Sequence, residues 1–102
     1  MEKIIAGVTV NVTEEGYLTD FSQWTKEIGY ANAKEQGVDM TATHWEVIDW
    51  IQSKFEKEEA LSIRSVKSSG IVDIKQFYAL FPEGPLKKAT LIAGIPKPKS
   101  CI

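Results

Sequence analysis

Residues 84–94, Gly-Pro-Leu-Lys-Lys-Ala-Thr-Leu-Ile-Ala-Gly, decide the fold because they mark both ends of one short helix. Proline is favoured in the first turn of a helix, where its missing N–H is not needed, and Pro85 stands at such a position. Glycine readily takes the left-handed conformation that ends many helices, and Gly94 stands where that residue belongs. The sequence therefore predicts a helix over 85–93.

The eight residues after this helix, Ile-Pro-Lys-Pro-Lys-Ser-Cys-Ile at 95–102, have a different character. Pro96 and Pro98 disfavour a regular helix and favour extended, polyproline-like backbone. Lys97 and Lys99 keep the segment soluble. We predict a single helical domain over 1–94 and a flexible C-terminal arm over 95–102.

Apolar periodicity predicts a first helix well upstream of this region. Asp20 can cap it together with Gln23, and Gly37 ends it. Its apolar residues recur at helical spacing: Phe21, Trp24, Ile28 and Ala31.

A second helix begins at Thr41 or at Thr43, and Thr43 would form a capping box with Glu46. Its apolar stripe predicts one buried face: Trp45, Ile48, Ile51 and Phe55. We interpret most of the large aromatic residues as core: Trp24, Trp45, Trp50, Phe55, Phe77 and Phe81.

Two shorter helices and a hairpin complete the expected domain. One helix covers 61–68 and stops at Gly70, and the other opens with a capping box of Asp73 and Gln76 and ends near Pro82. The β-branched residues of 3–12, interrupted by Ala6 and Gly7, predict an N-terminal hairpin. The expected fold class is mostly α (α+β): an orthogonal, winged-helix-like bundle of about five helices with an N-terminal β-hairpin.

Length and charge limit the possible functions. The chain has 102 residues, of which 43% are hydrophobic, so it has room for one core and no second domain. The net charge of −2 argues against nucleic-acid binding by a general excess of positive charge. Apolar runs fall short of the roughly 20 residues that span a bilayer, and the first residues lack a signal-peptide pattern. We expect a cytoplasmic protein.

The only cysteine of the chain is Cys101, the penultimate residue. One cysteine excludes an internal disulfide, and it cannot build a zinc or iron–sulfur site. His44 has no second histidine beside it, so we expect a structural role for it and no metal or other cofactor. Because the sequence holds no nucleophile–histidine–acid pattern, any catalytic role must depend on the thiol.

Several motifs together resemble the DsrC/TusE family, named after the gamma subunit of dissimilatory sulfite reductase and the TusE sulfur-relay protein. They are Phe-Pro-Glu-Gly-Pro at 81–85, Ala-Gly-Ile-Pro-Lys-Pro at 93–98, the penultimate cysteine, Gly-Tyr-Leu at 16–18 and His-Trp-Glu-Val-Ile at 44–48. The resemblance implies that Cys101 accepts sulfane sulfur as a persulfide from a donor protein and passes it to an acceptor protein. In this sense the chain would be a sulfurtransferase.

Family members that work with sulfite reductase carry a second cysteine at the position that Thr90 occupies here. Two thiols can close an intramolecular disulfide, whereas one thiol can only hold and pass on a persulfide. The resemblance is therefore to the single-cysteine, TusE-like branch, which delivers sulfur for tRNA 2-thiouridine synthesis. A relay in sulfur oxidation is the other destination that the resemblance allows.

Four basic residues are candidate binding residues. Lys97 and Lys99 favour the thiolate form of Cys101, and the terminal carboxylate of Ile102 opposes them. Arg64 and Lys67 lie on one side of the expected third helix, where the arm can dock between encounters with a partner.

Two other functions remain open at the level of sequence. In the first, the chain would be an accessory gamma subunit that inserts its arm into a sulfite reductase, although it lacks the second cysteine. Alternatively, it is a helix-turn-helix-like DNA-binding regulator in which Arg64 and Lys67 face phosphates. The negative net charge and the lack of a basic recognition helix argue against DNA.

Overall fold

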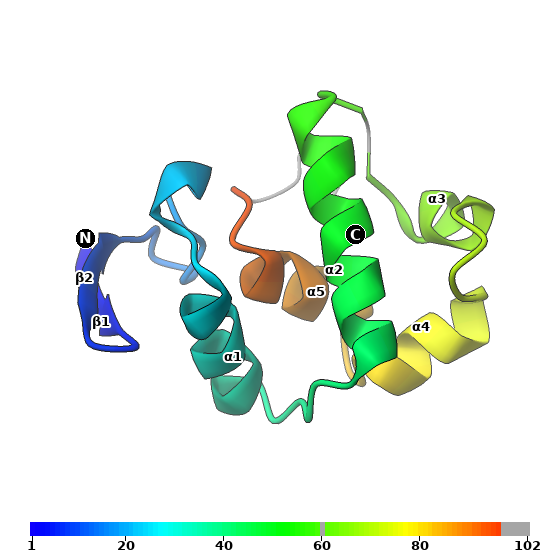
Figure 1. The fold of residues 1–102 in the computed structure, drawn as a ribbon, viewed down its shortest axis with the longest axis horizontal. Coiled ribbons are helices and arrows are strands. Elements are labelled where there is room, and N and C mark those ends of the chain that lie inside the picture. Colours follow the sequence, from blue (N-terminus) through cyan, green and yellow to red (C-terminus); the bar gives the residue numbers. More distant parts are fainter. Residues whose placement is uncertain (60, 97–102) are drawn as a thin grey trace.

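Helix α5 (Pro85–Ala93) lies in the middle of the structure, with the other elements arranged around it (Figure 1). The computed structural model describes residues 1–59 and 61–96. Before α5 come β1 (Glu2–Ile5), β2 (Val8–Asn11), the 3-10 helix η1 (Phe21–Gln23), α1 (Lys26–Glu35), α2 (Ala42–Glu56), α3 (Ile63–Ser68) and α4 (Ile74–Leu80). In the described part of the chain, the predicted five helices and N-terminal hairpin are confirmed.

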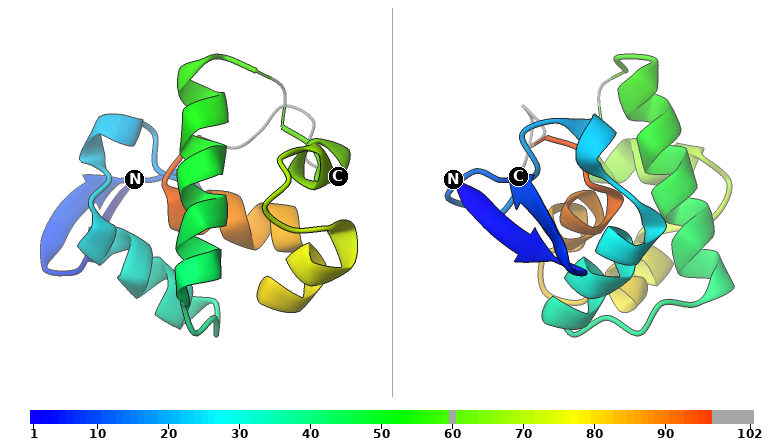
Figure 2. Two further views of the ribbon diagram at one scale, coloured as in Figure 1. Left: turned by 45° about the vertical axis from the view of Figure 1, so that its right-hand side comes forward. Right: turned by 60° about the vertical axis from the view of Figure 1, so that its left-hand side comes forward.

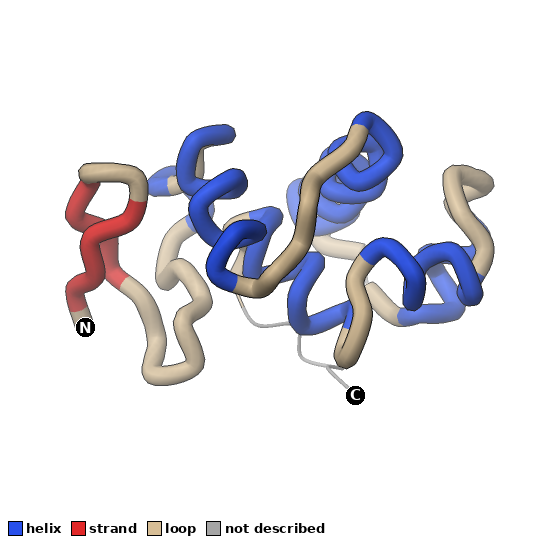
Figure 3. The backbone as a smooth tube through the Cα atoms, turned by 90° about the horizontal axis from the view of Figure 1, so that it is seen from below, coloured by secondary structure: helices blue, strands red, loops and turns tan. Residues whose placement is uncertain are grey.

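The central helix α5 is buried on nearly all sides. It packs against α1, α2 and α4, and seven of its nine residues are buried. A helix that is apolar all round belongs inside a core, as the composition of this segment indicates. α2 crosses α5 at a steep angle in Figures 1 and 2, which confirms the predicted orthogonal packing. The hairpin and the α3–α4 pair lie at opposite ends of the molecule (Figure 3).

Side chains from other elements cap the C-terminal end of α5. The last four carbonyls of an α-helix have no partner within the helix. Three of them here accept side-chain hydrogen bonds: Leu91 from Asn32 Nδ2 at 3.1 Å, Ile92 from Trp24 Nε1 at 2.8 Å, and Ala93 from Gln52 Nε2 at 2.8 Å. The fourth, Thr90 O, accepts from the amide of Gly94 at 3.1 Å. The end of α5 is thereby joined to α1, to the loop before α1, and to α2.

Gly94 makes this arrangement possible. Its φ of +73° is the left-handed conformation predicted from the sequence, and it ends α5 as expected. A Cβ atom at this position would lie 2.1 Å from Trp24 Cδ1, far inside van der Waals contact. The position therefore requires glycine twice, once for the backbone and once for the approach of the indole ring.

The N-terminal hairpin is confirmed with its turn at Ala6 and Gly7. Both turn residues have positive φ, at 53° and 77°, as a two-residue hairpin turn requires. The strands are antiparallel, with Ile5 opposite Val8. The inner face of the hairpin packs against α1 in a small cluster of its own: Ile5, Val10, Val12, Leu18 and Ile28. Trp24 also packs against this cluster, so its bond to α5 links the hairpin to the main core.

The prediction of one continuous helix from Asp20 to Gly37 is wrong. Asp20 caps only η1, and Trp24 and Thr25 are extended before α1 begins. Thr25 accepts a hydrogen bond from the amide of Ile28 and is the true N-cap. Periodicity alone missed the break because Trp24 stays in helical register with Ile28, although it leaves the helix to reach α5.

The predicted cap of α2 by Thr43 and Glu46 is also wrong, and the alternative start at Thr41 is correct. Thr41 accepts from the amide of His44, and the imidazole of His44 accepts in return from the amide of Thr41. Histidine thus takes the place that glutamate or glutamine holds in the usual capping box. The caps predicted for α4 and α5 are confirmed, and α3 begins at its own cap, Ser62.

Within the described residues, no helix is long and apolar enough to cross a membrane.

We predict that Gly94→Ala lowers the free energy of unfolding by about 3 kcal/mol, because it combines a strained left-handed residue with a clash against Trp24. Gly37→Ala is the matched control, since Gly37 has the same φ of +73° and a methyl group added there would have nothing within 4 Å. It should cost about 1 kcal/mol. Urea denaturation of both variants measures the difference. Equal losses in the free energy of unfolding would show that the close contact with Trp24 does not contribute to the cost of Gly94→Ala.

We predict that Gln52→Met lowers the free energy of unfolding by about 1–2 kcal/mol. Methionine matches the shape and helix propensity of glutamine, so the loss reports the unpaired carbonyl of Ala93. Gln36→Met is the control, because Gln36 follows the last residue of α1 and its backbone amide, not its side chain, makes the capping bond there. A thermal melt in which both variants match the wild type would contradict the capping role of Gln52.

Candidate functional site

The predicted reactive residue, Cys101, and its neighbours Lys97 and Lys99 lie outside the described residues. Covalent geometry still limits where the thiol can act. Cys101 follows Pro96 by five residues, and extended backbone covers at most about 3.3–3.6 Å per residue, so Cys101 lies within about 18 Å of Pro96. The shortest dimension of the molecule is 20 Å. This length is an upper limit on how far from Pro96 a reaction at Cys101 could take place.

That point is rigidly held. Ile95 belongs to the main core with 3% of its surface exposed, and Pro96 is half-buried. The capped end of α5 lies directly before it. In Figure 1 the described chain ends between η1 and the C-terminal half of α2. Anything that follows Pro96 therefore starts from a fixed place on the protein.

Three aromatic side chains stand beside this point, and we call Phe21, Trp24 and Phe55 the aromatic collar. Trp24 contacts Gly94, as its short distance to a Cβ there shows. Phe21 stacks on Trp24 with ring centroids 6.1 Å apart, and Phe55 meets Phe21 edge-on at 5.8 Å. Phe21 and Trp24 are half-buried, and Phe55 is 37% exposed. The sequence predicted Trp24 and Phe55 as core, and the exposure of Phe55 is a feature that only the structure shows.

Two charged residues are neighbours of collar residues in the sequence. Asp20, next to Phe21, accepts a hydrogen bond from the backbone amide of Ser22 at 2.9 Å, which lowers the pKa of its carboxyl group and keeps it charged. Lys54, next to Phe55, lies over the ring of Trp50 at 5.5 Å from the centroid and pairs with Glu59 at 3.2 Å. The ammonium group of Lys54 is therefore engaged by Trp50 and Glu59.

The structure does not bring Arg64 and Lys67 to this place. Both are exposed on α3, and no hydrogen bond or ion pair joins their side chains to another described residue. In Figures 1 and 2, α3 lies on the far side of α2 from the end of α5. The two residues form a separate basic surface.

His44 has the structural role that the sequence predicts. Its Nδ1 accepts from the amide of Thr41 at 3.0 Å, which places the ring proton on Nε2, and Nε2 donates to Leu80 O at 2.9 Å. The ring also packs edge-on against Phe81. Because both nitrogens are used, His44 joins the start of α2 to the end of α4 and is not available as a metal ligand.

Thr90 is fully buried in α5. Its hydroxyl donates to Leu86 O at 2.8 Å and to Lys87 O at 3.0 Å, within its own helix. The position that the resemblance assigns to a second cysteine therefore holds a satisfied core threonine. Cys101 is the only thiol of the whole sequence.

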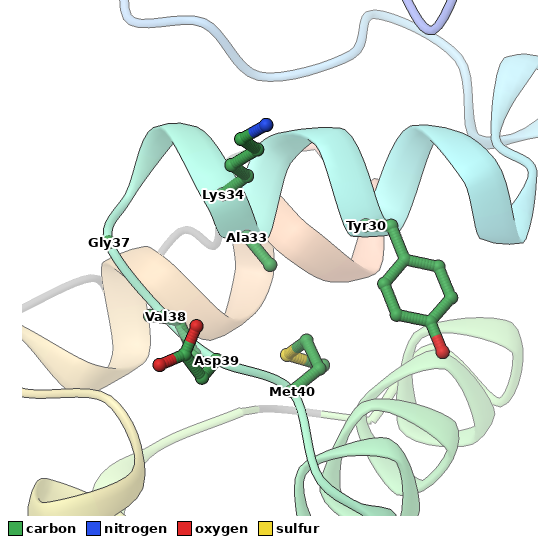
Figure 4. A pocket seen from close by; sticks show the side chains of 7 residues that line it. All are labelled: Tyr30, Ala33, Lys34, Gly37, Val38, Asp39 and Met40. Carbon is green, nitrogen blue, oxygen red and sulfur yellow. The ribbon is translucent and has the colours of Figure 1, made fainter.

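A shallow hollow of about 510 Å³ lies elsewhere, at the end of α1 and along the loop to α2. Figure 4 shows Tyr30 at one side of it and Lys34, Asp39 and Met40 around the rest. Tyr30 meets Trp45 of α2 edge-on at 4.8 Å. No sequence pattern pointed to this hollow. Among the described residues there is no group of three side chains suited to a metal ion.

Comparison with known proteins agrees with the motifs of the sequence. The model of the family described as "DsrC like protein" matches residues 4–102. The sulfurtransferase TusE of Salmonella typhimurium (strain LT2) is 34% identical over 107 residues, covering 97% of this chain and 98% of the relative. The sulfurtransferase TusE of Escherichia coli (strain K12) is 33% identical with the same coverage.

Solved structures share the whole fold. A chain in the crystal structure of dissimilatory sulfite reductase I (DsrI) superposes with a TM-score of 0.87 at 31% identity. DsrC of Allochromatium vinosum, solved by NMR, gives 0.83 at 30%, and the similarity covers 100% of both chains in each case. With the family match over almost the full length, these similarities establish that this chain belongs to the DsrC-like family.

Proposed function

We propose that the chain is a sulfur-relay carrier that accepts sulfane sulfur as a persulfide on Cys101 and passes it to a partner protein. The observation that carries the proposal is the place of its one cysteine, five residues beyond a rigidly held point of the chain. The relatives named sulfurtransferase TusE support sulfur transfer. In this proposal, the residues that follow Pro96 act as a mobile arm on the helical domain, since Ile95 itself is held in the core.

The proposed reaction needs no cofactor. The thiolate of Cys101 attacks the outer sulfur of a donor persulfide, R–S–SH, and a new S–S bond forms on Cys101. The old S–S bond breaks, and its electron pair leaves on the inner sulfur of the donor as R–S⁻. The acceptor thiolate then repeats the same exchange on the Cys101 persulfide. Each step conserves sulfur atoms, protons and electrons, so no external oxidant or reductant is required.

A single thiol suits a carrier. With threonine at position 90, the persulfide on Cys101 has no neighbouring thiol in its own chain that could displace the outer sulfur and close a disulfide. The sulfur therefore stays bound until a partner takes it. Lys97 and Lys99 support the thiolate and the persulfide anion by their positive charge.

The proposed partners are an upstream persulfide donor protein and a downstream acceptor protein. As the family resemblance implies, the proposed destination is a cytoplasmic relay for tRNA 2-thiouridine synthesis, with a sulfur-oxidation relay as the alternative. Similarity to a chain of DsrI favours a second candidate, an accessory subunit of a sulfite reductase. The missing second thiol argues against a full catalytic cycle there. DNA binding has less support, because it would depend on the exposed pair Arg64 and Lys67 in a chain of negative net charge.

We predict that inorganic polysulfide adds the mass of one sulfur atom to the wild-type chain and none to Cys101→Ser, measured by intact-protein mass spectrometry. Reductant should reverse the gain, because a persulfide is reducible. Absence of loading on the wild type, from polysulfide and from any persulfidated protein, would contradict the carrier function.

We also propose that Arg64 and Lys67 attract the arm between transfers. In an Arg64→Ala/Lys67→Ala double variant, we predict faster nanosecond motion of residues 97–102 in ¹⁵N relaxation, because the basic surface no longer holds the terminal carboxylate. Lys34→Ala/Lys75→Ala removes the same charge elsewhere and should leave the relaxation unchanged. Identical relaxation in both double variants would rule out docking at Arg64 and Lys67.

A further inference from the structure

The aromatic collar has solvent-facing edges that the fold itself does not require. Phe55 lies in the last turn of α2, where the helical backbone does not require an aromatic side chain. Of the surface of Phe55, 37% is exposed. Large aromatic side chains with one free edge are typical anchors in protein–protein interfaces.

The length of the arm decides what meets this surface. Cys101 lies within about 18 Å of Pro96. Pro96 in turn lies two residues after Gly94, which packs against Trp24. A partner that takes the thiol into its own active site must hold its reactive sulfur within reach of Pro96. A protein cleft that encloses several residues of the arm therefore brings the partner's surface down onto the residues around Pro96.

We propose that the aromatic collar is the docking surface for the protein that exchanges sulfur with Cys101, an inference that rests on the proposed carrier function. The partner has an apolar patch at the mouth of a narrow cleft, which seats the exposed edge of Phe55. The cleft is no deeper than about 18 Å from mouth to reactive cysteine. Binding at the collar places the start of the arm at the mouth of the cleft. It thereby lowers the entropy that is lost when Cys101 meets the partner's reactive sulfur.

The hollow near Tyr30 is a poorer place for the same partner. The hollow lies at the end of α1 and along the loop to α2, with Tyr30 at one side (Figure 4), whereas Phe55 is the second-last residue of α2. The ring that Tyr30 meets, Trp45, precedes Phe55 by ten residues of α2, which is about 15 Å along the helix. Tyr30 nevertheless resembles Phe55 closely, since each is exposed and each meets one half-buried aromatic ring edge-on. Tyr30 is therefore a matched control for Phe55.

The test uses the disulfide partner of Cys101 as its probe. Cells that produce the full chain are treated with the thiol oxidant diamide, which joins neighbouring thiols as a disulfide, and are lysed without reductant. The protein linked to the wild type and absent with Cys101→Ser is released with dithiothreitol and purified. Inorganic polysulfide loads this probe with persulfide. Sulfur transfer from the probe to the chain is then followed by mass spectrometry for the wild type, Phe55→Ala, Phe55→Leu and Tyr30→Ala, each checked for folding by a thermal melt.

We expect Phe55→Ala to reduce the second-order rate of transfer about tenfold, as the loss of an interface anchor does. Phe55→Leu keeps most of the apolar surface and should stay within about threefold of the wild type. Tyr30→Ala should stay within about twofold of the wild type, because its ring packs against Trp45 and is not part of the aromatic collar. All four chains should accept sulfur from inorganic polysulfide at one rate, because a small donor needs no docking surface.

Equal transfer rates for Phe55→Ala and Tyr30→Ala would overturn the docking role of the collar while the carrier function stands. Slower loading of Phe55→Ala by polysulfide would also overturn it, because the defect would then lie at the thiol. Failure of the wild type to accept sulfur from polysulfide and from the loaded probe would overturn the carrier function first and the collar with it.

Discussion

The structure depends on the capped C-terminal end of α5. Trp24, Asn32 and Gln52 reach it from three different elements and satisfy carbonyls that would otherwise be buried without partners. Gly94 then allows the indole ring to lie against the backbone. These contacts hold the two hydrophobic clusters together and fix the place where the chain leaves the core. A helix end that is usually frayed is the best-anchored part of this fold.

This anchoring explains how a small protein without an active site of its own can take part in group transfer. A thiol on an arm gains access to a partner's cleft. Its effective concentration at the partner's reactive group falls, however, as the arm becomes longer and its attachment less rigid. Here the base is held by the core, and only about 18 Å of chain separates it from Cys101. In the proposed relay, the remaining groups that the reaction needs belong to the partner, and the body positions the arm.

Local signals predicted much of the fold. The capping box of Asp73 and Gln76, the ends of α5 and the turn of the hairpin all depend on residues within four positions of one another, and all are confirmed. The wrong predictions also have a local cause. Trp24 continues the apolar period of α1, yet it leaves the helix for a carbonyl 68 residues away. A periodic pattern cannot tell a residue that packs along its helix from one that bonds to a distant segment.

The sequence by itself determined the chemistry: one cysteine, its place beside the C-terminus, and the proline- and glycine-rich segment that precedes it. These are properties of composition and order, and folding does not alter them. Only the tertiary structure decided that Asn32, Gln52 and Trp24 converge on one helix end, and that Phe55 presents an edge to solvent. The bonds at the helix end join residues 41 to 68 positions apart, and their partners are selected by the packing of the whole core.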